Sequence, residues 1–342
     1  MRKSKAIRQI VYLAGAVVLI GCIFRQHSGK PGANGVSAHG TLHVEGTLLS
    51  DKDGETVTLH GTSTHGIMWY PRYLNGNAMK TLAQYGANVQ RLAMYTEAYR
   101  GYLEYPEESL NYLYMGIESA MSADMYVIVD WHILEDGNPL EHAEEAIQFF
   151  DDMTSHYGNN PAILYEICNE PNGDTTWEDI VEYAHRVIPV IRKNAPDAVI
   201  LVGTPDYCTD FSGPLESPLP YDNVMYVLHN YIDMFKEEPS DVHLISKLVE
   251  NELPVFVTEW GMDHTEEEYF GENADWTKEK VYPDNAQPFL DYMEEHQISW
   301  TVWALSNKNE VHSLIKRDCE KYSGWKDEDL TEFGKWVFGN FR

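Results

Sequence analysis

The pattern of residues 126–170 gives the clearest prediction of the fold. These residues begin with the run Tyr126-Val-Ile-Val-Asp-Trp-His132 and end with Ile163-Leu-Tyr-Glu-Ile-Cys-Asn-Glu170. Both runs are rich in β-branched and aromatic residues, which predicts the strands Tyr126–Asp130 and Ile163–Cys168. Between them, apolar residues recur at helical spacing over residues 141–157. A strand, a helix and a second strand in succession predict a unit with two parallel strands.

The same alternation continues on both sides of this unit. Eight strands with helical crossovers over residues 57–338 predict an α/β fold, a single (β/α)8 (TIM) barrel. A doubly wound open sheet is the alternative, but it would show a Gly-rich phosphate loop after the first strand, and His60–Gly66 is not GxGxxG. The predicted strands are Val57–Gly61, Asn88–Met94, Tyr126–Asp130, Ile163–Cys168, Ala198–Gly203, Val224–His229, Val255–Glu259 and Ser299–Leu305, and the predicted helices lie near residues 76–86, 109–124, 141–157, 176–194, 240–252, 284–297 and 329–338.

The barrel domain is expected to span residues 40–342 and to open with a β-hairpin. The runs Leu42–Leu49 and Thr56–His60 flank Ser50–Gly54, which has the composition of a turn. The stretch Thr204–Asp222 is rich in Pro and Gly and is expected to be mostly loop.

The N-terminal 39 residues have a different composition. Met1–Arg8 is basic and Ile10–Phe24 is a 15-residue apolar run, which is typical of a secretory signal and short for a membrane span. Residues 1–24 are therefore expected to be a signal peptide or a membrane or lipid anchor, since Leu19-Ile-Gly-Cys22 resembles a bacterial lipobox. Residues 25–39 are polar and Gly-rich, typical of a flexible linker. The protein is expected to be secreted, either released or anchored to the cell surface.

The charge and the aromatic content of the chain restrict the class of ligand that it is expected to bind. The chain has 25 Lys and Arg against 54 Asp and Glu, a net charge of −29, which speaks against nucleic acid as a partner. Nine Trp and 22 Tyr suit a neutral, polar ligand such as a sugar. We expect a neutral, polar ligand and a monomer as the functional state.

No cofactor or metal is expected from the motifs. The sequence contains no HExxH, no GxSxG and no Walker loop. Cys168, Cys208 and Cys319 are not spaced as a metal site. A Cys208–Cys319 disulfide is conceivable and is left open.

Chemistry-bearing residues follow most of the predicted strands, at the end where barrel enzymes place their active sites. Glu170 and Glu259 each come directly after an apolar run, so burial should raise their pKa values unless a cation opposes it, and Arg91 is the natural opposing cation. Two carboxylates in contrasting surroundings are what glycosidic cleavage requires, one to donate a proton and one to stay ionised.

The residues at these ends resemble glycoside hydrolase family 5, in particular its bacterial endo-β-1,4-glucanase branch. The resemblance runs from about Leu42 to Leu314. It rests on the ordered motifs His60-Gly-Thr-Ser-Thr-His65-Gly66 with Trp69-Tyr70, Asn88-Val-Gln-Arg91, Val127-Ile-Val-Asp130-Trp131-His132, Tyr165-Glu-Ile-Cys-Asn169-Glu170-Pro171, His229-Asn-Tyr231, Val257-Thr258-Glu259-Trp260-Gly261 and Trp300-Thr-Val-Trp303 with Lys308.

The resemblance implies a β-glucan polysaccharide or oligosaccharide as the substrate, a retaining mechanism and a role for each site residue. Glu170 would be the general acid/base and Glu259 the nucleophile, with Arg91 keeping Glu259 anionic. Asn169 would bind the sugar 2-hydroxyl, and His229 and Tyr231 would position the two carboxylates. The implied sugar contacts are His65, Trp69, Tyr95, His132, Trp303, Lys308 and Glu310.

Two alternatives stay open. On the same scaffold, β-mannanase or xyloglucanase activity depends on cleft contacts that sequence does not define. A non-catalytic extracellular glycan-binding protein is a different class, disfavoured because Glu170, Glu259 and Arg91 are all present.

Overall fold

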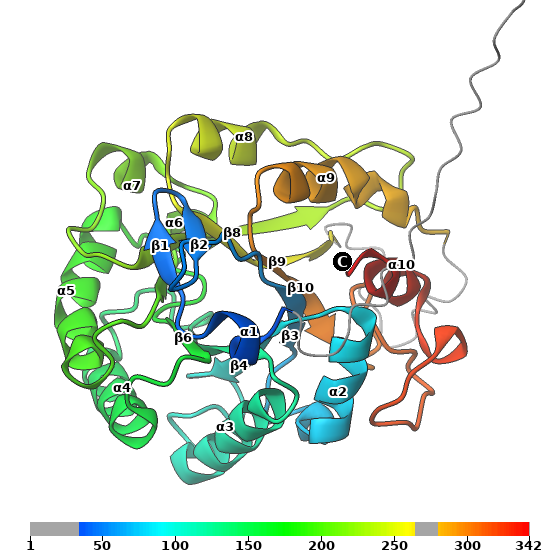
Figure 1. Cartoon of the computed structure of the whole chain (residues 1–342), viewed down its shortest axis with the longest axis horizontal. Helices are drawn as coiled ribbons and strands as arrows, with labels where there is room; N and C mark the ends of the chain where they lie inside the picture. The colour runs from blue at the N-terminus through cyan, green and yellow to red at the C-terminus, as the bar shows by residue number, and fades with distance from the viewer. Residues whose placement is uncertain (1–33, 264–279, 342) are drawn as a thin grey trace, which may run out of the picture.

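The computed structural model describes residues 34–263 and 280–341. In these residues, eight parallel strands close into a barrel in the order β10-β3-β4-β5-β6-β7-β8-β9, with helices around its outside (Figure 1). This confirms the predicted (β/α)8 barrel. No helix in the described ranges is both long and apolar enough to cross a membrane. The predicted signal or anchor (1–24) and most of the predicted linker (25–39) lie outside the described residues.

Most predicted elements are present, with ends that differ by a few residues. The barrel strands are β3 (His60–Thr64), β4 (Val89–Tyr95), β5 (Tyr126–His132), β6 (Ile163–Glu166), β7 (Ile200–Val202), β8 (Val224–Ile232), β9 (Val255–Met262) and β10 (Trp300–Leu305). The predicted crossover and C-terminal helices are α2 (Gly76–Tyr85), α3 (Pro106–Met121), α4 (Ala143–Tyr157), α5 (Trp177–Asn194), α8 (His243–Glu250), α9 (Gln287–Glu295) and α10 (Glu332–Asn340).

The N-terminal hairpin is present, but its turn is not the predicted one. Its strands are β1 (His43–Glu45) and β2 (Leu48–Ser50), and Gly46 takes a positive φ of 64° between them. The predicted turn at 50–54 does reverse the chain, because the Asp51 carboxylate accepts the backbone N–H groups of Asp53 and Glu55. The residues after it run back along β2, with Val57 N–H donating to the Leu49 carbonyl at 2.9 Å. Barrel pairing therefore starts at His60, three residues later than predicted.

The structure corrects one further expectation, refines a second and answers one open question. Val36–His39, inside the predicted linker, forms the short helix α1 and its first N–H donates to the Asp124 carbonyl at 3.2 Å. The predicted loop after β7 contains the short helices α6 (Pro205–Cys208) and α7 (Ser212–Glu216). Cys208 and Cys319 are free thiols and form no disulfide. The buried Cys208 sulfur lies 2.9 Å from the Asn169 carbonyl oxygen instead.

The barrel interior has an apolar lower layer and a polar upper layer. Below, the hairpin residues Leu42 and Leu49 pack against inward-facing strand residues such as Ile128, Leu164 and Phe256. Figure 1 shows this hairpin lying across the ring of strands. Because alternate strand residues face inward, the next inward positions along each strand toward its C-terminal end form a second layer. The residues at those positions are Arg91, Asp130, Glu166 and Thr258, all fully buried.

Candidate active site

Arg91 on β4 is the centre of the polar layer. Its guanidinium donates from Nε and Nη2 to both oxygens of Glu166, at 2.7 and 2.9 Å. Nη1 lies 2.6 Å from Oε1 of Glu259, and Nη2 lies 3.0 Å from Asp130 and 2.7 Å from Oδ1 of Asn169. Burial opposes the charge of Arg91, but Asp130, Glu166 and Glu259 raise its pKa well above the usual value. One permanently charged cation therefore holds three buried carboxylates.

Glu259 on β9 is held as an anion. Its Oε1 accepts from Arg91, and its Oε2 accepts the phenol hydrogen of Tyr231 at 2.7 Å. Burial would raise the pKa of Glu259, but the nearby His229 and Arg91 outweigh it and lower the pKa to about 2. Arg91 is thus the opposing cation expected from the sequence, and together with His229 it prevents burial from raising this pKa.

A bulge on β9 brings two successive residues into the site. Val227 pairs with Phe256 and His229 pairs with Glu259, so β9 advances three residues while β8 advances two. Strand residues normally alternate between faces, but the extra residue lets Thr258 and Glu259 both reach the interior.

Glu170 follows β6 along the chain. Its Oε1 lies 2.7 Å from Nδ1 of the buried His229, and its side chain is 14% exposed. Burial lowers the pKa of His229, but Glu259 and then Glu170 raise it by more. One oxygen of Glu170, one oxygen of Glu259 and a ring nitrogen of His229 lie within 4.8 Å of one another.

Asp130 and His132 on β5 form a buried pair. Nδ1 of His132 lies 2.6 Å from Oδ2 of Asp130. Burial raises the pKa of Asp130 to about 7 despite Arg91. Burial and the charge of Arg91 lower the pKa of His132 to about 4, so this imidazole is neutral at neutral pH.

Aromatic rings form a wall beside the carboxylates. Trp303 on β10 is buried, and its ring stacks on His132 with 5.5 Å between centroids and lies 5.1 Å from the ring of His65. The centroid of the Tyr95 ring lies 4.0 Å from that of His132 and 4.5 Å from that of Trp69. The structure therefore gathers the five predicted aromatic sugar contacts. The Trp303–Ala304 peptide is cis.

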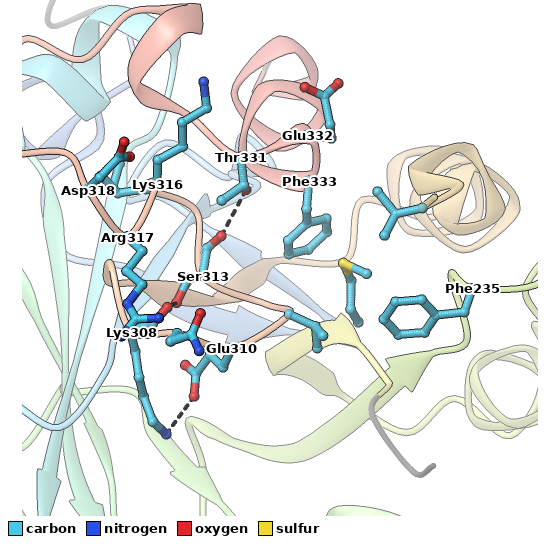
Figure 2. Close-up of a pocket in the computed structure, with 15 residues that line it drawn as sticks. Phe235, Lys308, Glu310, Ser313, Lys316, Arg317, Asp318, Thr331, Glu332 and Phe333 are labelled. Carbon is cyan, nitrogen blue, oxygen red and sulfur yellow. Dashed lines mark hydrogen bonds and ion pairs between the residues drawn. The ribbon is translucent and has the colours of Figure 1, made fainter. Parts of the chain in front are cut away.

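Lys308 and Glu310 close one end of this wall. Their side chains form an ion pair at 2.5 Å, and His65 Nε2 lies 3.1 Å from Lys308 Nζ and 3.5 Å from Glu310 Oε1. Figure 2 shows this pair at the edge of a cavity of about 530 Å³, which reaches to Phe235 and to Phe333 at the start of α10. His312 adds a second imidazole 3.1 Å from Glu310. Despite burial, His312 and His65 lower the pKa of Glu310 well below its usual value.

The loop after β7 lies against the Glu170 strand end. Asp206, Tyr207 and Cys208 all have positive φ, a costly conformation for residues with side chains. Tyr207 donates its N–H to the Pro171 carbonyl at 3.1 Å, while its ring is 48% exposed. The backbone of an exposed tyrosine is thereby hydrogen-bonded to the residue that follows Glu170.

The structure brings the six residues that were predicted to be catalytic close together, and sequence reasoning missed several of their partners. Asp130, Glu166 and Thr258 lie inside apolar strands, where each could be taken for a stray polar residue. The signal that could have found them is the period of two: Asp130 lies two residues before His132, and Thr258 and Glu166 align with inward-facing apolar residues.

Two groups of described side chains bring three potential metal-ligand atoms within 4.8 Å: Glu97, Glu141 and His142, and Glu170, His229 and Glu259. The first is mostly exposed. In the second, the hydrogen bonds of His229 to Glu170 and of Tyr231 to Glu259 already account for the arrangement. We assign this second group to acid–base chemistry.

Comparison with known proteins points to one family. The model of the cellulase family, glycosyl hydrolase family 5, matches residues 50–309. Endoglucanase A of Butyrivibrio fibrisolvens is 42% identical over 305 residues, which cover 87% of this chain and 68% of that protein. An endoglucanase of Clostridium saccharobutylicum is 36% identical over 328 residues, covering 95% of this chain and 70% of that protein. The chain thus spans about two thirds of the length of these relatives.

Solved structures agree. The catalytic domain of a Thermobifida fusca endoglucanase is 32% identical and superposes with a TM-score of 0.79, covering 90% of this chain and 98% of that domain. A variant of the same domain, with the same identity, coverage and TM-score, was solved in complex with cellotetraose. The family match covers more than half of the chain and includes every predicted catalytic residue. The chain belongs to glycoside hydrolase family 5.

Proposed function

We propose that this protein is a retaining endo-β-1,4-glucanase, which hydrolyses internal β-1,4-glucosidic bonds through a covalent glycosyl-enzyme. The observation that carries the proposal is the contrast between two neighbouring carboxylates. Glu170 and Glu259 have oxygens within 4.8 Å of each other, which suits direct attack by one of them and leaves too little room for an inverting water. Glu259 is bound by Arg91 and Tyr231, whereas Glu170 is bound by a histidine that can hold a proton.

In the first step Glu259 is the nucleophile. Its carboxylate attacks the anomeric carbon, the bond from that carbon to the glycosidic oxygen breaks, and Glu170 gives its proton to the departing oxygen. Arg91 keeps Glu259 ionised beforehand, and the Tyr231 hydroxyl orients the second carboxylate oxygen. Asn169, whose Oδ1 is held by Arg91 and whose Nδ2 donates to the Ile133 carbonyl at 3.0 Å, is the residue to which we assign the contact with the sugar 2-hydroxyl.

In the second step Glu170 acts as a base. A water molecule attacks the anomeric carbon, its proton passes to Glu170, and Glu259 is released as a carboxylate. Two inversions at one carbon return the original β configuration. His229 remains bound to Glu170 in both steps.

The aromatic wall binds the glucan chain. A β-linked glucose ring has axial C–H groups on both faces, which pack on the indole of Trp303 and on the rings of Trp69 and Tyr95. His65, His132, Lys308 and Glu310 supply donors and acceptors for equatorial hydroxyls. The cellotetraose complex of the Thermobifida fusca domain, which shares the fold and 32% identity, supports a β-1,4-glucan over mannan or a branched glucan.

The test is to follow the anomeric configuration of fresh products by NMR while the protein hydrolyses a β-1,4-gluco-oligosaccharide. We expect the β-anomer first, with the α-anomer appearing only by mutarotation. An initial α-anomer would contradict the role of Glu259. No cleavage of the gluco-oligosaccharide, with cleavage of mannan or xyloglucan, would move the substrate to those polymers, and binding without any cleavage would indicate a glycan-binding protein.

We also propose that the protein acts outside the cytoplasm, as a secreted or surface-anchored enzyme. The support is the basic segment Met1–Arg8 followed by the apolar run Ile10–Phe24. Cell fractionation with mass spectrometry of the mature N-terminus tests this. A chain that begins at a lipidated Cys22 would show anchoring, a cleaved and unlipidated chain would show release, and a full-length cytoplasmic chain would contradict the proposal.

A further inference from the structure

Thr258 connects the surroundings of the two catalytic carboxylates. It precedes Glu259 on β9 and is fully buried. Its Oγ1 lies 3.0 Å from Nε2 of His229 and 3.0 Å from Oε1 of Glu166. The hydroxyl therefore stands between the histidine that binds Glu170 and the carboxylate that binds Arg91.

The direction of these hydrogen bonds follows from Glu166. Both of its oxygens accept N–H groups from Arg91, at 2.7 and 2.9 Å, so this carboxylate acts as an acceptor. The Thr258 hydroxyl hydrogen must then point to Glu166, which leaves only lone pairs of the hydroxyl facing His229. Nε2 of His229 must carry a hydrogen to complete the second bond.

This arrangement determines what the other nitrogen of His229 can do. Nδ1 lies 2.7 Å from Oε1 of Glu170 and 3.8 Å from Oε2 of Glu259. Since the Nε2 hydrogen is held by Thr258, the bond between Nδ1 and Glu170 contains one transferable proton. That is the proton which the glycosidic oxygen must receive.

We propose that Thr258 is a positioning residue for proton transfer: with Glu166 it holds the Nε2 hydrogen of His229, so that Nδ1 returns the shared proton to Glu170. The proposal rests on the proposed function, in which Glu170 is the acid/base. In the first step the proton leaves the bond between Nδ1 and Oε1 and ends on the glycosidic oxygen. In the second step a proton of the attacking water restores it.

The groups that act electrostatically on this pair come from several strands. The charged or titratable side chains around Glu170 and His229 are Arg91, Tyr95, Asp130, His132, Glu166, Cys208, Tyr231 and Glu259. Replacement of the uncharged Thr258 leaves all of them in place. A change in proton transfer can therefore be separated from a change in the charge of the site.

The experiment compares Thr258→Val, which keeps the shape and removes the hydroxyl, with Thr258→Ser, which keeps the hydroxyl. Each is assayed on cellotetraose and on 2,4-dinitrophenyl β-cellobioside, whose leaving group needs no proton. For Thr258→Val we expect kcat/KM to fall about ten-fold or more on cellotetraose and to stay within about two-fold on the dinitrophenyl glycoside. Thr258→Ser is expected to retain near wild-type values on both substrates.

Equal losses on the two substrates would mean that Thr258 only supports the structure, and no loss would mean that proton transfer does not need it; either result overturns the proposal. If the wild-type protein cleaves neither substrate, the proposed function fails instead. Should Thr258→Val not fold, ¹⁵N NMR of labelled histidines in the wild type decides, with His229→Gln to assign the signal. We expect Nε2 of His229 to carry a hydrogen from about pH 5 to 8, and a bare Nε2 would contradict the proposal.

Discussion

Nη1 of Arg91 lies 2.6 Å from Oε1 of Glu259, while Nε and Nη2 of the same guanidinium bind both oxygens of Glu166. The planar fork of Arg91 is thus fixed by one carboxylate and presented to another. Because the guanidinium cannot lose its proton in the usual pH range, the charge that opposes Glu259 is permanent. His229 and this contact with Arg91 together lower the pKa of Glu259 to about 2 in a position where burial alone would raise it.

Arg91→Lys should therefore move the acid limit of activity. A lysine ammonium cannot bind Glu166 through two parallel bonds and reach Glu259 as well, so the pKa of Glu259 should rise toward that of an ordinary carboxyl. We expect a much lower kcat/KM and an acid limb at higher pH than in the wild type, measured from the pH dependence of kcat/KM. Arg186→Lys, in the exposed pair with Glu144, is the control and should change neither. An unmoved acid limb would contradict the role of Arg91.

Glu259→Gln should abolish turnover and leave sugar binding largely intact. The amide keeps the size of the carboxylate and its place beside Arg91 and Tyr231, but it does not attack the anomeric carbon. Titration calorimetry with cellotetraose and a reducing-sugar assay on the same preparation check both halves. Glu45→Gln, on the exposed part of the hairpin, is the matched control and should keep wild-type turnover. Appreciable turnover by Glu259→Gln would remove Glu259 as nucleophile.

Glu166→Gln should destabilise the protein. The substitution leaves the buried Arg91 with one fewer anionic partner and removes one of two short, parallel hydrogen bonds. Breaking a buried ion pair from one side costs about 3–5 kcal/mol, against about 0–1 kcal/mol for an exposed pair. Urea denaturation of Glu166→Gln and of Asp151→Asn, which breaks the exposed pair with Lys193, measures the difference. Equal free energies of unfolding for the two variants would contradict the importance of the polar layer.

The sequence was sufficient for the barrel and for the residues at its strand ends. Glu170 and Glu259 could be identified because each follows an apolar run at the end of a strand where barrel enzymes carry their chemistry. Asp130 and Glu166 were missed because they lie within apolar runs; the period of two marks them as inward-facing, but it does not show that they bind Arg91 on a different strand. Only the closed barrel shows that these positions are at one level of its interior.

The position of the hairpin turn and the β9 bulge escaped prediction for local reasons. Both Gly46 and the stretch Ser50–Gly54 have turn composition, and the chain uses both, so the first turn makes the hairpin and the second directs the chain into the barrel. The bulge leaves no mark in the composition of β9, because it is a difference in register with β8. Without it, strict alternation would place Thr258 and Glu259 on opposite faces.

The free energy of unfolding should be highest between about pH 4.5 and 6.5, because Glu259 loses its stabilising contribution below this range and His229 loses its contribution above it. The pKa of Glu259 falls to about 2 in the folded state, so its contribution is present above its unfolded value and is lost as the pH falls from about 4.5 to 2. By linkage this loss is on the order of 3 kcal/mol. The raised pKa of His229 has the opposite sign, so its contribution is lost as the pH rises above about 6.5.

The pH-dependent contributions of Asp130 and His132 to the free energy of unfolding should offset each other inside that range. His132 is kept neutral with a pKa of about 4, so it loses stability as the pH falls from about 6.5 to 4, whereas Asp130, with its pKa raised to about 7, gains stability over nearly the same interval. The substitution Asp130→Asn removes the gain in stability that comes from Asp130 and leaves the loss that comes from His132. Urea denaturation between about pH 2 and 8 should therefore give a plateau for the wild type and a continuous decline below about pH 6.5 for Asp130→Asn. If the free energy of unfolding depended on pH in the same way in both proteins, the raised pKa of Asp130 would be contradicted.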